Sequence, residues 1–183
     1  MKGLIILGNY FEDTEAITTI NILRRAKISL DVVAVGDNLL VKTQTGLQVK
    51  ADYLLNDINI DNYSFLVIPG GKAVYEVLGK EKSVLKTIDK FVNENKLIAA
   101  ICAAPSLIGE RCHFKNHEFT CFPTCEKGIK EGKYLPKKSV IRSGNFITGK
   151  AMGYTSEFAY EIVEYLLGKK ERQIVEKKCK GEL

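Results

Sequence analysis

Short aliphatic runs alternate with longer segments of helical periodicity along this chain. The runs cover residues 3–7, 31–35, 65–68 and 97–101, and each has the length of a strand. Runs of this kind are typical of strands buried on both faces of a parallel sheet, and the segments between them suit crossover helices. The order therefore predicts an α/β fold with an open, mostly parallel sheet and helices on both faces.

Capping and turn residues add detail in the N-terminal half. Thr14 is expected to cap the first helix, and Ser83 to stand just before a second one. Residues 39–50 alternate in polarity around Gly46, which predicts a peripheral hairpin.

Similar signals continue toward the C-terminus. Residues 118–122 and 145–149 predict further strands. A helix that begins at Thr155 or Ser156 is expected to stop at Gly168, because glycine often follows the last helical turn.

The chain is expected to fold as one domain over residues 1–183. Its 183 residues are 45% hydrophobic and 27% charged, which suits one core without disulfides or metals. It contains no internal repeat, low-complexity stretch or Pro/Ser-rich linker that would mark a domain boundary.

The compartment is predicted from apolar runs and cysteines. The N-terminal apolar run is too short for a signal peptide, and nowhere do about 18 apolar residues follow one another. Five cysteines without a regular framework suit reduced thiols. We therefore expect a cytoplasmic protein with no membrane segment.

The net charge of +5 is modest. Much of the basic excess lies in residues 127–138 and 168–180, where glutamates are interleaved with the lysines. Because no basic and aromatic groove pattern accompanies them, solvated surfaces explain these segments better than a nucleic-acid footprint. No nucleic-acid partner is expected.

Three loops are candidates for a functional site, because sites in open parallel sheets form beyond the carboxyl ends of the strands. They are residues 8–15, residues 69–71 and the segment that begins at Cys102. Cys102 has Ala100 and Ala104 two positions to either side, as a tight strand-nucleophile-helix turn requires. A helix N-terminus would lower the pKa of such a thiol. The alternative is a buried, inert cysteine that ends a strand.

Two neighbouring features are consistent with a site around this cysteine. Gly70 and Gly71 would let the backbone approach the sulfur, and the Gly71 and Ala103 N–H groups would form an oxyanion hole. An ordinary turn explains the glycines equally well. Glu15 either favours the start of a helix by its charge or donates a hydrogen bond to the thiolate as a protonated carboxyl group.

Three segments in register, residues 11–17, 67–71 and 97–105, resemble the ThiJ/PfpI (DJ-one) family, specifically its DJ-one-like branch. The similarity continues in order and spacing over residues 1–168. It implies a flavodoxin-like fold, similar to that of class I glutamine amidotransferases, and a homodimer.

The resemblance also assigns roles. It implies that Cys102 is the nucleophile and oxidation-sensitive centre, and that Glu15, not Glu12, is hydrogen-bonded to it. The chain departs from its relatives at Ala103 and Phe122, where some members carry histidine. No histidine is therefore expected near the cysteine to act as a base.

Metal binding is a weaker alternative for the remaining cysteines and histidines. His113 and His117 lie near Cys112, Cys121 and Cys125, but the gaps do not match paired-ligand spacing, so we expect surface histidines, no metal and no cofactor. The roles of these three cysteines and of Cys179 stay open.

These observations favour two functions. The first is a weak cysteine-dependent enzyme of glyoxalase or deglycase type, in which Cys102 and Glu15 act on small carbonyl compounds or glycated adducts. The second is a redox sensor or chaperone-like stress-protective protein that works through Cys102 oxidation. Amidase or protease activity and thiazole-monophosphate biosynthesis, both attached to relatives, form a third possibility, although no phosphate-binding lysine or arginine accompanies the glycines.

Overall fold

The computed structural model describes residues 1–182 and contains one seven-stranded sheet in the order β10-β11-β7-β6-β1-β2-β5. Neighbouring strands are parallel except β10 and β11, which are antiparallel. The strands are β1 (Lys2–Leu7), β2 (Ser29–Ala34), β5 (Tyr53–Leu54), β6 (Phe65–Ile68), β7 (Leu97–Ile101), β10 (Val140–Ser143) and β11 (Phe146–Gly149). The five longest parallel strands follow the flavodoxin-like order 2-1-3-4-5, which confirms the predicted fold class.

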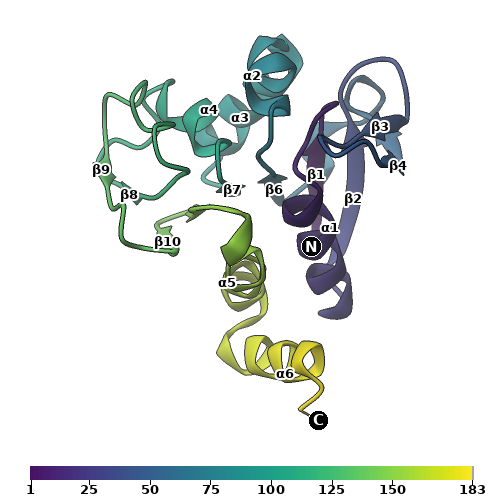
Figure 1. Ribbon diagram of the computed structural model, residues 1–183, viewed down its shortest axis with the longest axis vertical. Coiled ribbons are helices and arrows are strands. Elements are labelled where there is room, and N and C mark those ends of the chain that lie inside the picture. Colours follow the sequence, from purple (N-terminus) through teal and green to yellow (C-terminus); the bar gives the residue numbers. More distant parts are fainter. Residues whose placement is uncertain (183) are drawn as a thin grey trace.

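Helices cover both faces of the sheet (Figure 1). In this view α1, α5 and α6 lie on one side, and α2, α3 and α4 lie on the other. The α-helices are α1 (Asp13–Arg25), α2 (Ala73–Glu76), α3 (Lys82–Asn93), α4 (Pro105–Gly109), α5 (Thr155–Leu167) and α6 (Lys169–Lys180). Short 3₁₀ helices cover η1 (Leu55–Asp57), η2 (Ile60–Asn62), η3 (Leu78–Lys80) and η4 (Met152–Tyr154).

Two small sheets lie outside the main one. The predicted hairpin is confirmed as antiparallel β3 (Leu40–Lys42) and β4 (Gln48–Lys50). The strand expected over residues 118–122 is shorter, because only β8 (Glu118–Phe119) pairs, and its partner is β9 (Lys133–Tyr134) rather than the main sheet.

The central strands are buried because helices pack on both of their faces. All residues of β6 and β7 are buried, which explains why their bounds match the predicted runs. Burial of Val67, Ala99 and Ala100 is complete or nearly so, and the small alanines leave room for the chain to turn sharply after β7.

Two helix starts differ from the prediction. Thr14 does not cap the first helix: α1 begins at Asp13, and the Glu12 carboxylate accepts a hydrogen bond from the Glu15 N–H at 2.7 Å. Ser83 lies inside α3, which begins one residue earlier at Lys82. The N-cap of α1 is therefore Glu12, and not Thr14 as the sequence predicted.

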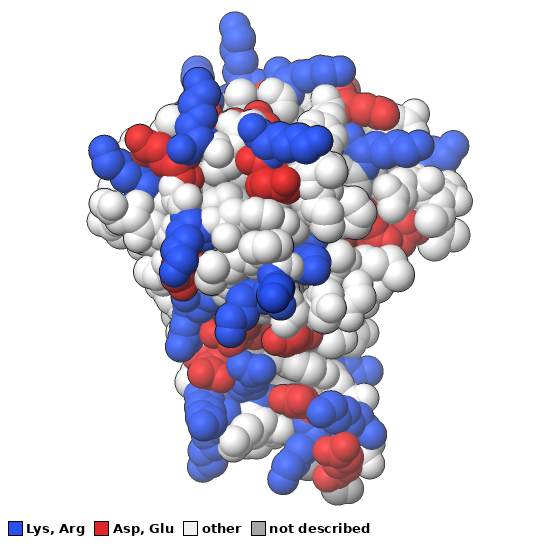
Figure 2. Space-filling view, turned by 60° about the vertical axis from the view of Figure 1, so that its left-hand side comes forward, with Lys and Arg blue, Asp and Glu red and all other residues white. Residues whose placement is uncertain are grey.

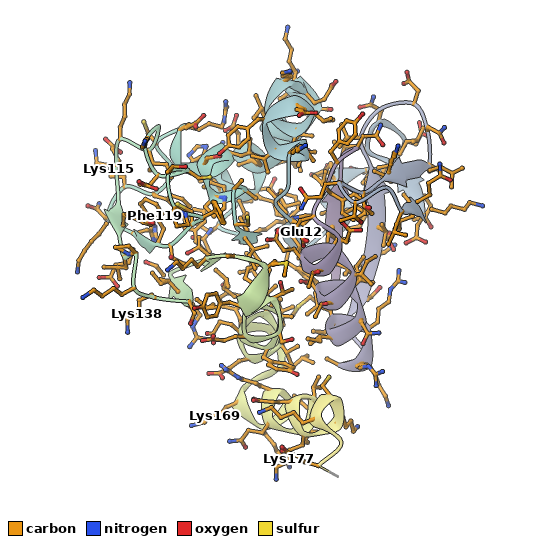
Figure 3. The ribbon with its side chains drawn as sticks, in the orientation of Figure 1. Glu12, Lys115, Phe119, Lys138, Lys169 and Lys177 are labelled. Carbon is orange, nitrogen blue, oxygen red and sulfur yellow. The ribbon has the colours of Figure 1, made fainter. Side chains whose placement is uncertain are left out.

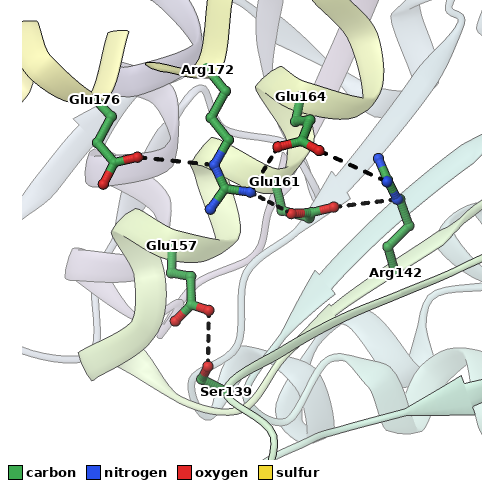
Figure 4. A network of polar contacts seen from close by, with 7 residues as sticks. All are labelled: Ser139, Arg142, Glu157, Glu161, Glu164, Arg172 and Glu176. Atoms are coloured by element: carbon green, nitrogen blue, oxygen red, sulfur yellow. Dashed lines mark hydrogen bonds and ion pairs between the residues drawn. The ribbon is translucent and has the colours of Figure 1, made fainter. Parts of the chain in front are cut away.

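Ion pairs fasten the C-terminal helix to the rest of the molecule. Arg172 on α6 contacts Glu161 and Glu164 on α5, at 2.8 and 3.0 Å, and Arg142 on β10 reaches the same two carboxylates from the other side (Figure 4). The face shown in Figure 2 carries interspersed basic and acidic side chains. No helix within residues 1–182 has the length and apolar character needed to cross a membrane.

Candidate active site

Three loops that follow β1, β6 and β7 meet where the strand order reverses. In doubly wound sheets this crevice is the usual place for a ligand. Isolated bridges join Phe11 after β1 to Gly71 after β6 and to Thr43 in the hairpin. The Tyr10 N–H also donates to the Lys42 carbonyl at 2.6 Å, so the hairpin is tied down over the crevice.

Cys102 directly follows β7 and adopts a left-handed conformation, with φ 63°. A residue with a side chain rarely occupies this region, and such strain persists only where the surroundings enforce it. Here the Cys102 N–H donates to the Gly149 carbonyl at 2.9 Å, and its carbonyl accepts from the Phe122 N–H at 2.8 Å. The sharp turn that follows holds the half-buried thiol at the crevice.

Gly70, rather than both glycines, permits the close approach to the cysteine. A Cβ at Gly70 would lie 2.7 Å from Cys102 Cβ and 2.8 Å from Glu15 Oε2. Gly71 is required for another reason, because its φ is +90° and a Cβ there would lie 2.5 Å from the Glu12 nitrogen. Gly71 therefore packs against the loop after β1.

Glu15 is 1% exposed and points from the first turn of α1 toward the crevice. Its Oε2 accepts a hydrogen bond from the Gly70 N–H at 2.7 Å, whereas its buried Oε1 has no donor within residues 1–182. Burial raises the pKa of Glu15 to about 7, and the Gly70 N–H partly opposes this rise. A carboxyl oxygen without a donor is less costly to bury when it carries a proton.

Cys102 and Glu15 interact directly and are coupled acids. Burial, followed by the charge of Glu15, raises the pKa of the Cys102 thiol, and the Ala103 N–H opposes this. The lowering expected from a helix N-terminus is therefore not found, because the thiol is largely buried and α4 has only five residues. Of these two adjacent acids Glu15 therefore loses its proton first, near pH 7, and its charge then disfavours the thiolate.

Glu12 lies beside the pair and has a structural task of its own. Its carboxylate caps α1 at the Glu15 N–H, and Figure 3 labels it at the start of that helix. Burial raises the pKa of Glu12, and the Glu15 N–H opposes the rise. A substitution that removes its capping oxygen would therefore disturb Glu15 as well.

A cavity of about 280 Å³ opens at Cys102. Its walls are formed by Glu12, Glu15, Gln44, Gly71, Cys102, Phe122, Ala151 and Met152. Ala103 does not line it, but its N–H is directed at the sulfur. A hollow of about 430 Å³ between α1, α5 and α6 contains none of the predicted site residues.

Three wall residues were missed by sequence reasoning. Ala151 and Met152 follow β11, a strand whose carboxyl end also reaches the crevice, so the loop after it was an available signal. Gln44 belongs to the hairpin and had no comparable signal. Its place depends on the contact between the hairpin and the loop after β1, where the Gln44 N–H donates to the Phe11 carbonyl at 2.9 Å.

The two histidines lie outside this cavity. His113 contacts Asp89 at 2.8 Å, and His117 contacts Ser143 at 3.1 Å. No group of three or more His, Cys, Asp or Glu side chains is placed to hold a metal ion in the described chain. Phe122 lines the cavity where some relatives were expected to carry histidine, and it is 46% exposed.

A doubly wound sheet with a strained cysteine beside a buried glutamate defines the class as a flavodoxin-like α/β protein with a cysteine at the turn after a central strand. The profile of the DJ-1/PfpI family matches residues 1–165, and the chain belongs to this family. The resemblance inferred from the three motifs is thereby confirmed.

Named relatives place the chain among DJ-1 proteins. It is 31% identical to Drosophila melanogaster protein dj-1beta over 177 residues, which cover 96% of this chain and 95% of that one. It is 30% identical to Arabidopsis thaliana protein DJ-1 homolog B over 91% of this chain. The matched region spans only 38% of the length of the Arabidopsis protein.

Solved structures show the same fold. A mutant of a DJ-1 superfamily protein from Salmonella typhimurium superposes with a TM-score of 0.90 at 27% identity, covering 99% of this chain and 97% of that one. Drosophila melanogaster DJ-1beta superposes with a TM-score of 0.89 at 30% identity, covering 98% of both chains. Toxoplasma gondii DJ-1, described as oxidized, has a TM-score of 0.90 at 25% identity and covers 97% of both chains.

Proposed function

We propose that this protein is a cysteine-dependent enzyme of carbonyl stress, with slow glyoxalase or deglycase-type chemistry on small reactive aldehydes or their adducts. The observation that carries the proposal is the buried Glu15 carboxyl group beside Cys102, with a pKa raised to about 7 and one oxygen that lacks a donor. Such a group is suited to move a proton near neutral pH.

The first chemical step is addition of sulfur to an aldehyde. The Cys102 thiolate forms a C–S bond with the carbonyl carbon, the C=O π electrons move to oxygen, and that oxygen takes the proton of Glu15. A hemithioacetal and an ionised Glu15 result. We expect the Gly71 and Ala103 N–H groups to polarise the carbonyl, since Gly71 lines the cavity and the Ala103 N–H faces the sulfur.

The later steps are expected to be slow. No histidine of residues 1–182 lines the cavity, and the Glu12 oxygen is engaged at the cap of α1, so Glu15 must both give and take protons. A separately positioned base typically contributes about 10²–10⁴-fold. Efficient peptide hydrolysis is not expected for the same reason.

Turnover of methylglyoxal by the wild type and by Cys102→Ser tests the proposal. We expect slow turnover in the wild type and none in the variant, with product identified by mass spectrometry. Turnover that survives in Cys102→Ser, or fast peptide hydrolysis that depends on Cys102, would refute it.

Oxidation of Cys102 is the second candidate function. Peroxide would convert the thiolate to a sulfenic acid with release of hydroxide, and a second equivalent would give the sulfinic acid. The solved Toxoplasma relative described as oxidized favours this candidate, as does the missing histidine. Peroxide titration should add two oxygen atoms to Cys102 before any other thiol, and equal oxidation of the exposed Cys112 would count against it.

We also infer a cytoplasmic homodimer, an inference that rests on the family. Ile17 on α1 is 44% exposed and would be covered by a partner. A monomer in sedimentation analysis would contradict this part of the proposal.

A further inference from the structure

The cavity at Cys102 is lined by two buried carboxyl groups. Glu12 and Glu15 are 7% and 1% exposed, and both line it. No lysine, arginine or histidine of residues 1–182 contributes to its walls. Any charged group that enters therefore meets carboxyl groups without a cationic partner beside them.

Two backbone donors near the start of α1 are already occupied. The Glu15 N–H, at the start of α1, donates to Glu12 Oε2 at 2.7 Å. The Gly70 N–H donates to Glu15 Oε2, also at 2.7 Å. The positive end of α1 is thus satisfied by the side chains of the protein itself, so it offers little to an incoming carboxylate or phosphate.

The site gains negative charge as the pH rises above about 7. Glu15, whose pKa burial raises to about 7, then loses its proton, while the thiol of Cys102 keeps its own. Burial also raises the pKa of Glu12, and the capping hydrogen bond opposes this rise. At mildly alkaline pH an anionic ligand would consequently face buried carboxylates in a setting where repulsion is weakly screened.

The outer wall of the same cavity is apolar. Phe122 and Met152 are 46% and 53% exposed and stand with Ala151 around the entrance. Gln44 is the one uncharged polar side chain among the wall residues. A substituent that extends outward from the sulfur would therefore contact an aromatic ring and a thioether side chain.

We propose that this cavity is a charge filter, which admits uncharged electrophiles with an apolar substituent to Cys102 and rejects anionic ones. Combined with the proposed carbonyl chemistry, on which this step rests, the filter excludes oxo acids and other carbonyl compounds that bear a carboxylate.

Alkylation by iodoacetamide and iodoacetate tests the filter, because the two reagents differ in charge and neither carries an aldehyde. The rates at Cys102 are measured by peptide mass spectrometry and referred to those of the neutral thiol mercaptoethanol. We expect the preference of Cys102 for the amide over the acetate to exceed that of mercaptoethanol by about tenfold or more. Equal preferences would overturn the proposal.

A pair of variants assigns the effect to the cavity. Glu12→Gln removes one charge and keeps an oxygen that can cap α1, whereas Glu81→Gln removes one charge at the exposed N-cap of α3, outside the cavity. We expect the first variant to lower the amide preference several-fold, and the second to leave it unchanged. An identical response of both would show that only the overall charge matters, and would overturn the proposal.

The apolar wall is tested with N-benzyl iodoacetamide. Relative to iodoacetamide, it should react faster with Cys102 in the wild type, and Phe122→Ala should remove the advantage. No advantage in the wild type would overturn the substituent part of the proposal. Since all these reagents lack an aldehyde, a failure of carbonyl turnover would refute the proposed enzyme and leave the measured filter standing.

Discussion

At the scale of single residues, the site depends on close contacts that tolerate no added atom. Because Gly70 has no side chain, the backbone of the loop after β6 can lie close to both Cys102 and Glu15. The Gly70 N–H also orients the Glu15 carboxyl group. The left-handed Cys102 is held by the hydrogen bond that its N–H donates to Gly149, at the end of β11, and by the one that its carbonyl accepts from the Phe122 N–H. Strain here is maintained by contacts far apart in the sequence.

Gly70→Ala should therefore destabilise the protein and disturb the thiol together. The new methyl group would lie 2.7 Å from Cys102 Cβ, and we expect a loss of about 1–3 kcal/mol in urea denaturation, with an altered alkylation rate at Cys102. Gly153→Ala is the matched control, since a Cβ there would meet nothing within 4 Å. Similar losses for the two variants would contradict the contact described.

Phe122→His tests whether the missing base limits turnover. Phe122 lines the cavity, and an imidazole at this position would titrate near the working pH. We expect carbonyl turnover to increase about tenfold or more, as a positioned base allows, whereas Phe122→Ala should not increase it. An unchanged rate in Phe122→His would mean that proton transfer is not the slow step.

At the scale of elements, agreement between sequence and structure follows burial. The runs 65–68 and 97–101 match β6 and β7 because complete burial on both faces leaves an uninterrupted apolar signal. Burial alone is not sufficient, because Phe119, Thr120 and Cys121 are buried and yet only Glu118 and Phe119 form a strand, which pairs with β9 outside the main sheet. The start of α1 was misplaced because a buried glutamate is an uncommon cap.

The ion pairs of Arg172 with Glu161 and Glu164 hold α6 against α5. Arg172→Met would leave Glu161 and Glu164 with Arg142 alone, and we expect a loss of about 1–2 kcal/mol with faster hydrogen exchange in α6, less marked at high salt. Lys180→Met, which breaks an exposed pair with Glu176, should cause no measurable change. A salt-independent loss would point to packing instead.

At the scale of the whole molecule, the sheet brings Cys102, Glu15 and Gly71 together from three crossovers. Each was predicted from its place after a strand, and the choice of Glu15 over Glu12 came from the family resemblance. Gln44 escaped prediction because a long-range contact with the loop after β1 positions it in the cavity, whereas Met152 was overlooked although it follows β11. The raised thiol pKa was missed because burial around a residue is not visible in its neighbours along the chain.

The pH dependence of the free energy of unfolding should reveal the raised pKa of the buried Glu15 carboxyl group. Burial raises the Glu15 pKa from 4.5 to about 7, so its stabilising contribution is complete below about pH 4.5 and is lost as the pH rises through 7. Glu15→Gln removes this titration while keeping an acceptor for the Gly70 N–H. Relative to the wild type, the variant should gain about 3 kcal/mol between pH 4.5 and pH 8 in urea denaturation. A constant difference would show that Glu15 titrates normally.

The central claim is that Glu15 and Cys102 are interacting acids whose protonation states depend on each other, and the pH dependence of Cys102 alkylation in Glu15→Leu tests it most directly. Leucine removes the charge of Glu15 that raises the pKa of the thiol, so the midpoint for thiolate formation should fall and alkylation above pH 7 should become faster. Glu15→Gln also removes the charge and keeps an N–H donor for the thiolate, so its midpoint should fall at least as far. A midpoint that stays unchanged or rises in both variants would contradict the account, because it would mean that the charge of Glu15 does not act on the thiol.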